Sequence, residues 1–480
     1  EIDAIAPPTN PTTYTSGMAD FSNFVSLGNS FTTGYSDGAL FIDAQENSFP
    51  NILANQFALA GGGTFTQPLM NDNLGGLLLG GQQITSNRLY LSFASGSPAP
   101  VPVSGTPTTE VSNILLGPFN NLGVPGAKSF HLGAVGYGNV AGVSLGLSNP
   151  YFARMASSPN ATVIGDAISQ NPSFFSLFIG NNDVLTFASS GGDGEDQTGN
   201  LDPTTYGSND ITDPNVFASV YNGLLQALTA NGAEGIVMNI PSITSFPYFT
   251  TVPYNAIPLD AATAGAVNQG YAPYNGGIQQ AFNALAGTGL FTEEELEKRT
   301  INFTAGQNAV VIIDEDLTDL GAINPAFAAL PKYRQATAED FLVFTSQTIL
   351  GTVVNNNPQL INGVSVPLAD KWVLTPEEQL KISNTIDGYN ALIKGAADSA
   401  GLAYVDADNY YNIIRTQGLT DGKFKLTNSL VTGGFFSLDG VHPTARAYAL
   451  LTNILMKTLD AKFGSNFEAS GNLLDIGDYP

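Results

Sequence analysis

The 480-residue sequence predicts an α/β fold, namely a three-layer α/β/α sandwich with a central parallel sheet and an inserted cap region. Four short runs of apolar residues are continuous rather than alternating, as in strands that are buried on both faces. Three of these runs end at Gly or Pro, which stop strands, and helical stretches separate the runs. This succession is typical of a parallel sheet that is covered by helices on both sides.

The predicted strands follow one another along the chain with long separations. They are residues 24–27, 174–179, 235–240 and 402–406. Gly28, Gly180 and Pro241 follow the first three runs directly. Because parallel strands need crossover connections, the long separations favour a parallel sheet over hairpins.

The best-defined predicted helix begins at Thr375. Thr375 as N-cap, Pro376 at the first helical position and Glu378 three residues after the cap form a capping box. Apolar residues then recur along one stripe at helical spacing, at Ile382, Ile386, Tyr389, Ile393 and Ala397. Gly401 ends this helix, and a second strong helix follows Pro443.

The remaining segments predict a tether and several insertions. Residues 1–20 are rich in Pro, Thr and Asn and are expected to form a flexible tether. Residues 21–480 are expected to form one domain with insertions at about 60–115, 189–214 and 242–370, the last acting as a cap or subdomain. The chain starts without Met, so we expect a processed chain whose leader, with a possible lipid anchor, has been removed.

The composition limits the classes of partner. The chain has 41 Asp and Glu but 16 Lys and Arg, a net charge of −25, and charged residues are 12% of the total. Nucleic acid needs a basic footprint, so we expect no such partner. Zero Cys excludes disulfides, thiolate metal sites and cysteine nucleophiles, and no apolar run is long enough for a transmembrane helix. We expect an exported, monomeric bacterial protein of the periplasm or cell surface.

The chain has two histidines, which narrows the choice of a general base. His442 follows Asp439 by three residues and precedes a helix, so a turn can place the carboxylate on one imidazole nitrogen. The alternative is a helix-capping Asp beside an incidental His. His131 has no carboxylate nearby in sequence, and packing or substrate lining is the favoured interpretation for it.

Ser30 is the candidate nucleophile. It follows the first predicted strand directly and lies where a turn or helix begins, at the carboxyl edge of the sheet where open α/β folds bind ligands. An N-cap serine is the structural alternative. The Gly-x-Ser-x-Gly pattern of α/β-hydrolases does not occur around it.

Gly126 and Asn182 are candidate donors to an oxyanion. Gly126 offers an unobstructed backbone N–H and Asn182 a side-chain amide, and both lie in turns that are expected at strand ends. Each signal is weak by itself, because Gly and Asn end strands routinely.

The order of these blocks resembles the SGNH (GDSL-type) hydrolase family, whose fold is a flavodoxin-like α/β/α sandwich. The resemblance implies that Ser30 is the nucleophile and an oxyanion donor, that Gly126 and Asn182 complete the oxyanion hole, and that Asp439 and His442 are the triad acid and base. The sequence departs from the pattern in two ways: Asn29 replaces the usual Asp, and 442 − 30 = 412 residues separate Ser30 from His442.

The sequence therefore predicts serine-dependent hydrolysis of carboxylic esters without a cofactor or metal, on a lipid ester or an acetylated carbohydrate. A non-catalytic cell-surface protein that binds glycan or lipid on the same scaffold is the alternative. Residues 191–196 match one Gly-Gly-x-Gly-x-Asp repeat, for which Ca²⁺ and a solvated acidic loop are the two interpretations, and a single copy favours the loop.

Overall fold

The computed structural model describes residues 13–94 and 98–480, and the chain divides into two compact units. The first unit comprises residues 1–183, 214–245 and 387–480, and the second comprises residues 184–213 and 246–386. The second unit overlaps two of the predicted insertions, whereas the predicted insertion at about 60–115 belongs to the first unit.

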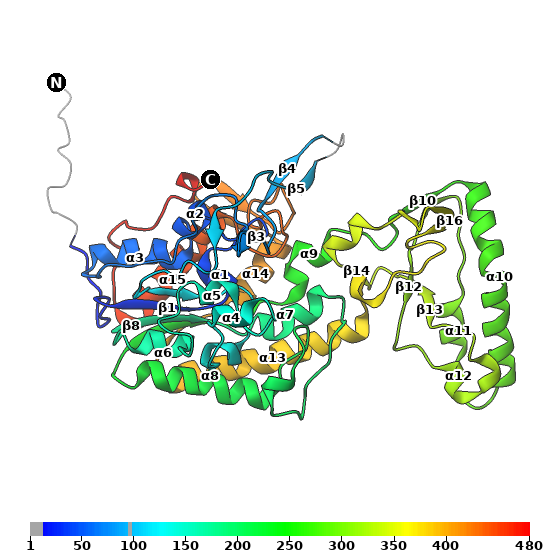
Figure 1. The fold of residues 1–480 in the computed structure, drawn as a ribbon, viewed down its shortest axis with the longest axis horizontal. Helices are drawn as coiled ribbons and strands as arrows, with labels where there is room; N and C mark the ends of the chain where they lie inside the picture. Colours follow the sequence, from blue (N-terminus) through cyan, green and yellow to red (C-terminus); the bar gives the residue numbers. More distant parts are fainter. Residues whose placement is uncertain (1–12, 95–97) are drawn as a thin grey trace, which may run out of the picture. The chain divides into compact units, whose positions relative to one another are not determined.

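The first unit is built on a five-stranded parallel sheet with the order β18-β9-β8-β1-β7 (Figure 1). Its strands are β1 (Phe24–Gly28), β7 (Asn121–Gly123), β8 (Phe174–Phe178), β9 (Glu234–Met238) and β18 (Ala403–Val405). All residues of β1, β7 and β8 are buried, which explains why the sequences of β1 and β8 do not alternate between apolar and polar residues. The α/β class and the parallel sheet are therefore as predicted.

Helices cover both faces of this sheet, which gives three layers (Figure 1). On one face lie α3 (Phe49–Leu59) and α15 (Ala445–Phe463), and on the other lie α6 (Val163–Ile168) and α8 (Pro214–Thr229). Phe21, Phe57 and Phe174 form an aromatic core, and the first two stack with centroids 3.7 Å apart. Phe217 of α8 stacks on Tyr389 at 3.9 Å, which fixes the opposite layer.

Shorter elements complete the first unit. The helices are α1 (Ser30–Thr33), α2 (Ile42–Glu46), α4 (Val140–Val143), α5 (Pro150–Ala153) and α14 (Ala407–Thr416). The strands are β2 (Leu77–Leu79), β3 (Gln82–Gln83), β4 (Leu89–Ser92), β5 (Ala99–Pro102), β6 (Thr109–Glu110), β19 (Leu419–Asp421) and β20 (Phe424–Leu426). Two helices, α7 (Asn182–Ser189) and α13 (Pro376–Ser399), have residues in both units.

The second unit consists of antiparallel strand pairs and helices. The pairs are β10 (Ile257–Leu259) with β11 (Gly306–Asn308), β12 (Val311–Ile313) with β13 (Tyr333–Gln335), β14 (Phe341–Leu342) with β17 (Val373–Leu374), and β15 (Val353–Val354) with β16 (Asn357–Ile361). The helices are α9 (Pro247–Thr250), α10 (Ala261–Ala284), α11 (Glu293–Arg299) and α12 (Leu320–Ile323). Arg334 of β13, which is 1% exposed, forms ion pairs with Asp314 at 2.5 Å and with Asp340 at 2.6 Å. These ion pairs connect β13 to the end of β12 and to the start of β14.

The segment predicted as a flexible tether, residues 1–20, is hydrogen-bonded to the rest of the chain at Thr15 and Met18, while residues 1–12 lie outside the described part of the chain. Met18 N–H donates to Phe463 O at 2.8 Å, and Thr15 N–H donates to Asn466 Oδ1 at 2.9 Å. These bonds hold the segment at the end of α15. Among the described residues, no helix is long and apolar enough to cross a membrane.

Candidate active site

Ser30 lies at the carboxyl end of β1, as the first residue of the short helix α1. The side chain of Asn29 accepts the N–H of Phe31 at 3.1 Å, which caps this helix. A Cβ on Gly28 would lie 2.2 Å from Thr32 Oγ1, so the turn from strand to helix requires glycine there. The turn thus presents the Ser30 hydroxyl at the edge of the sheet.

His442 and Asp439 form an unbroken hydrogen-bonded row with Ser30. His442 Nε2 lies 2.8 Å from Ser30 Oγ, and His442 Nδ1 lies 2.9 Å from Asp439 Oδ2. Asp439 Oδ1 accepts the N–H groups of Val441 and His442, each at 2.8 Å. Because a carboxylate only accepts, we assign the ring proton to Nδ1, which leaves Nε2 to accept from the Ser30 hydroxyl.

The environment of Asp439 keeps its carboxylate ionised. Burial by itself raises the pKa of Asp439, but the neighbouring His442 and the hydrogen bonds from His442 and Val441 together bring the pKa below its usual value. Asp439 therefore carries its negative charge beside Nδ1 of the imidazole.

Two aromatic side chains hold the imidazole in place. The rings of Tyr35 and Phe31 lie 4.7 and 5.0 Å from the ring of His442. Tyr35 O–H donates to Gly38 O at 2.6 Å, and burial raises the pKa of Tyr35 well above its ordinary value. Tyr35 is therefore a neutral wall of the site rather than a second acid or base.

Gly126 and Asn182 lie on two neighbouring loops that a hydrogen bond connects. Gly126 is exposed on the loop after β7 with a φ of +80°, a conformation that favours glycine. Asn182 begins α7 after β8, and its Nδ2 donates to Ala127 O at 2.9 Å. The side chain of Asn182 is thus tied to the residue next to Gly126.

These loops lie against the turn that carries Ser30. Val124 N–H donates to Gly28 O at 2.9 Å, and Asn29 Nδ2 donates to Asn181 Oδ1 at 3.0 Å. The five predicted site residues therefore come from three strand ends of one sheet and from the loop before α15. The triad members are joined directly by hydrogen bonds, whereas Gly126 and Asn182 are joined to the Ser30 turn through neighbouring residues.

Asp183 is a buried residue of this region that the sequence analysis did not single out. Its carboxylate accepts Ser129 N–H at 2.8 Å and Ser129 O–H at 2.7 Å, and it is fully buried. The bonds fix the segment after Gly126 to the start of α7. The position of Asp183 directly after Asn182 is the one sign in the sequence that it belongs to this region. Nothing in the sequence indicates that Ser129 is its hydrogen-bond partner.

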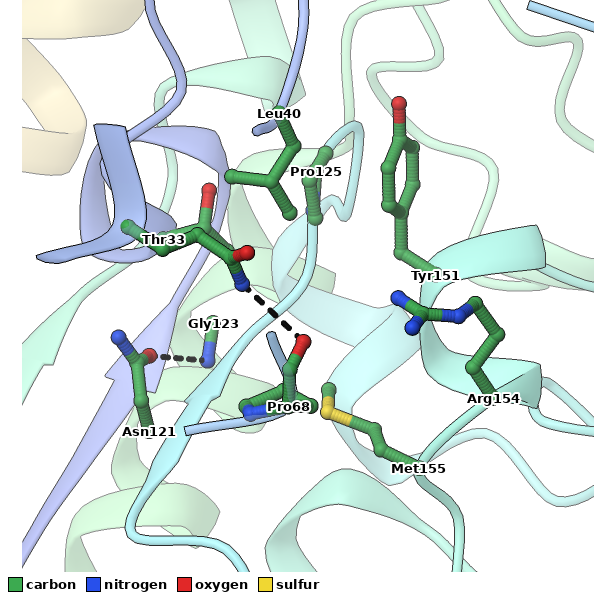
Figure 2. A pocket seen from close by; sticks show the side chains of 10 residues that line it. Thr33, Leu40, Pro68, Asn121, Gly123, Pro125, Tyr151, Arg154 and Met155 are labelled. Carbon is green, nitrogen blue, oxygen red and sulfur yellow. Dashed lines mark hydrogen bonds between the residues drawn. The ribbon is translucent and has the colours of Figure 1, made fainter. Parts of the chain in front are cut away.

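A small cavity lies beside the loop of Gly126 (Figure 2). Its lining residues include Thr33, Gly123, Pro125, Tyr151 and Arg154. Its volume of about 10 Å³ is that of a single water, so it is too small for an ester. Arg154 donates to Leu69 O at 2.9 Å, and burial lowers its pKa to about 10, which leaves it charged at neutral pH.

His131 lies outside the triad. Its Nδ1 accepts Lys128 N–H at 3.0 Å, and its ring stacks on Tyr137 with centroids 4.5 Å apart. Burial, followed by the charge of Lys128, lowers the pKa of His131 to about 4. The ring is therefore neutral near pH 7 and serves packing, which agrees with one of the two interpretations made from the sequence.

The acidic loop that matched one calcium repeat is held by protein donors. Asp210 accepts Glu195 N–H at 3.0 Å, Gly207 N–H at 2.7 Å and Gln197 Nε2–H at 2.5 Å, and Asp196 accepts Thr198. The carboxylates of Asp210 and Asp196 thus take part in hydrogen bonds within the loop.

Three other carboxylates of the second unit gather within 4.8 Å of one another, namely those of Glu315, Asp370 and Glu378. Burial raises the pKa of Glu378 to about 7. Burial, with a hydrogen bond and the charge of Glu315, raises the pKa of Asp370 well above its usual value. The raised pKa values of Asp370 and Glu378 keep part of this acidic cluster protonated at neutral pH.

Comparison with known proteins gives little guidance. No family model matches the chain, and no curated protein matches it. Among solved structures, the chain is similar to a catalytic mutant of an acetylxylan esterase from Geobacillus stearothermophilus, at 10% identity and a TM-score of 0.33. The match covers 92% of this chain and 96% of that one. A likeness of this degree identifies neither a family nor a reaction.

Proposed function

We propose that the chain is a serine-dependent hydrolase of carboxylic esters. The observation that carries the proposal is the continuous row from Ser30 Oγ through both nitrogens of His442 to Asp439, with separations of 2.8 and 2.9 Å. This row lies at the carboxyl edge of a parallel sheet, where α/β folds bind their ligands.

In the proposed reaction, His442 Nε2 takes the proton of Ser30 as Oγ attacks the ester carbonyl. Asp439 holds the Nδ1–H tautomer and stabilises the imidazolium that forms. His442 then gives the proton to the leaving alcohol, which leaves an acyl group on Ser30 Oγ. A water, deprotonated by His442, attacks this acyl group, and the carboxylic acid and free Ser30 result.

The oxyanion would be bound by the N–H groups of Ser30 and Gly126 and the amide of Asn182. The bond of Asn182 to Ala127 supports this role, because it holds the amide at the loop that carries Gly126. The order of these residues along the chain resembles that of SGNH hydrolases, and we place the chain with that family as part of the proposal. An acetylated carbohydrate and an acyl lipid are the two substrate classes to compare.

Labelling by a fluorophosphonate tests the nucleophile. The probe should label the protein and its Ser22→Ala variant, in which an exposed serine is removed, but not Ser30→Ala. Equal labelling of Ser30→Ala would overturn the assignment.

A panel of p-nitrophenyl esters of increasing acyl length, together with acetylated sugars, tests turnover and defines the substrate. If no ester is hydrolysed and no probe reacts, the alternative of a glycan- or lipid-binding protein is favoured.

A further inference from the structure

A two-residue turn after α1 lies against the acid of the proposed triad. Asp37 and Gly38 have φ values of +51° and +74°, and Ser36 and Ala39 on either side exchange backbone hydrogen bonds at 3.1 and 3.0 Å. Positive φ at both central residues is the pattern of a type I′ turn, for which Asp-Gly is a favoured sequence.

Three hydrogen bonds join this turn to residues about 400 positions later in the chain. Gly38 N–H donates to Asp439 Oδ2 at 2.9 Å, and Asp37 N–H donates to Ser437 Oγ at 2.9 Å. In the other direction, Leu438 N–H donates to Asp37 Oδ1 at 3.0 Å. The two turns therefore hold each other through donors and acceptors on both sides.

The oxygen that Gly38 contacts is also the one that receives His442 Nδ1. Gly38 N–H thus fixes the direction of Oδ2, and with it the plane of the imidazole. Because this donor is a backbone N–H, its presence does not depend on a side chain. Its position depends on the contacts that hold the turn in place. Asp37 supplies such a contact through its side chain, because its carboxylate accepts the N–H of Leu438, the residue directly before Asp439.

We propose that Asp37 is a positioning residue, whose carboxylate fixes the turn so that Gly38 N–H orients the carboxylate of Asp439. The proposal rests on the proposed function, since it assigns to Asp37 a part in the same reaction. It adds a residue that acts through Asp439 rather than on the substrate.

Two substitutions separate the hydrogen bond from the backbone conformation. Asp37→Asn keeps an oxygen for Leu438 N–H and tolerates positive φ. Asp37→Gly also tolerates positive φ but removes the acceptor. Asn171→Gly is the matched control, because Asn171 is exposed, has a φ of +49° and precedes β8 away from the site.

With p-nitrophenyl acetate, Asp37→Gly should lower kcat by about tenfold or more, since a misplacement of about 1 Å can cost roughly 10²-fold. KM should change by less than about twofold, and Asp37→Asn and Asn171→Gly should retain the kcat of the unaltered chain. A kcat of Asp37→Gly equal to that of the unaltered chain would overturn the proposal, as would an Asp37→Asn variant that is equally impaired.

Proton NMR of the full chain gives a second readout that needs no turnover. A downfield Nδ1–H signal is expected for His442 and not for His131, because His131 Nδ1 is an acceptor, and His442→Gln should remove the signal. The signal should shift or broaden in Asp37→Gly and not in Asp37→Asn. If this happens in a chain that hydrolyses no ester, the proposed function fails and the positioning role stands. An unchanged signal in Asp37→Gly overturns the positioning role.

Discussion

Two sets of carboxylates in this chain have opposite electrostatic environments. Asp439 of the first unit accepts hydrogen bonds from four donors, and its pKa lies below the usual value although it is largely buried. In the acidic cluster of the second unit, Asp370 Oδ1 is buried without a hydrogen-bond partner, and the pKa values of Asp370 and Glu378 are raised. Hydrogen-bond donors and the charge of the neighbour, rather than burial alone, decide whether a buried carboxylate stays charged: His442 lies beside Asp439, whereas Glu315 lies beside Asp370 and Glu378.

The largest effect on kcat is expected for Asp439→Asn, which removes the charge of the carboxylate and keeps the shape of the side chain. Asp439→Asn should lower kcat by about 10⁴-fold, because an amide favours the wrong tautomer of His442. Steady-state kinetics with p-nitrophenyl acetate check this, and circular dichroism verifies that the variant folds. A loss of less than about tenfold would show that the ionised carboxylate has no part in turnover.

A smaller effect is expected at the oxyanion donor. Asn182→Ala should lower kcat by about 10²–10³-fold and change KM much less, because the amide acts on charge that develops in the transition state. Asn231→Ala is the comparison, since it removes an exposed amide in the turn before β9, away from the site. Equal kcat values for the two variants would argue against a special role for Asn182.

The smallest expected effect is a change in the stability of the folded chain, caused by the acidic cluster. Below a pH of about 4.5 Glu378 is protonated whether the chain is folded or unfolded. Between 4.5 and its folded pKa of about 7, only the unfolded chain loses the proton, so unfolding releases protons and stability falls as pH rises. Above this window the folded chain bears the full cost of the buried charges.

Asp370→Asn should therefore stabilise the chain at pH 8 by about 1 kcal/mol, which is roughly 2–4 °C for a unit of 150–250 residues, and should flatten the fall of stability with pH. Thermal scans at pH 5 and pH 8 measure both effects. Glu297→Gln, at an exposed position of α11, is the control and should leave the pH dependence unchanged. A loss of stability at pH 8 in Asp370→Asn would contradict the assignment of a destabilising charge cluster.

The sequence was informative where local rules dominate. Continuous apolar runs predicted β1, β8, β9 and β18, because strands that are buried on both faces cannot alternate. The capping box at Thr375 predicted α13, and Thr375 N–H donates to Glu378 Oε2 at 2.7 Å as such a box requires. The strand β7 was not among the predicted strands, since its three residues, which include Asn121 and Gly123, form no apolar run.

Contacts between distant segments were beyond the sequence. The Asp-Gly pair at residue 37 indicates a turn, but nothing local shows that the turn contacts Asp439. Likewise, the capping role of Glu378 was predictable, whereas its approach to Asp370 and Glu315 depends on how separate strands and loops of the second unit pack. The catalytic roles of the five predicted site residues stay a prediction until the variants are measured.

The placement of Ser30 and His442 at opposite ends of the sequence has a consequence for biosynthesis. A ribosome that has made Ser30 must add 442 − 30 = 412 further residues before the imidazole of His442 exists. At about 5–20 residues per second, the nascent chain carries an inactive hydroxyl for roughly 20–80 s. The proposed activity would therefore begin only when synthesis is nearly finished.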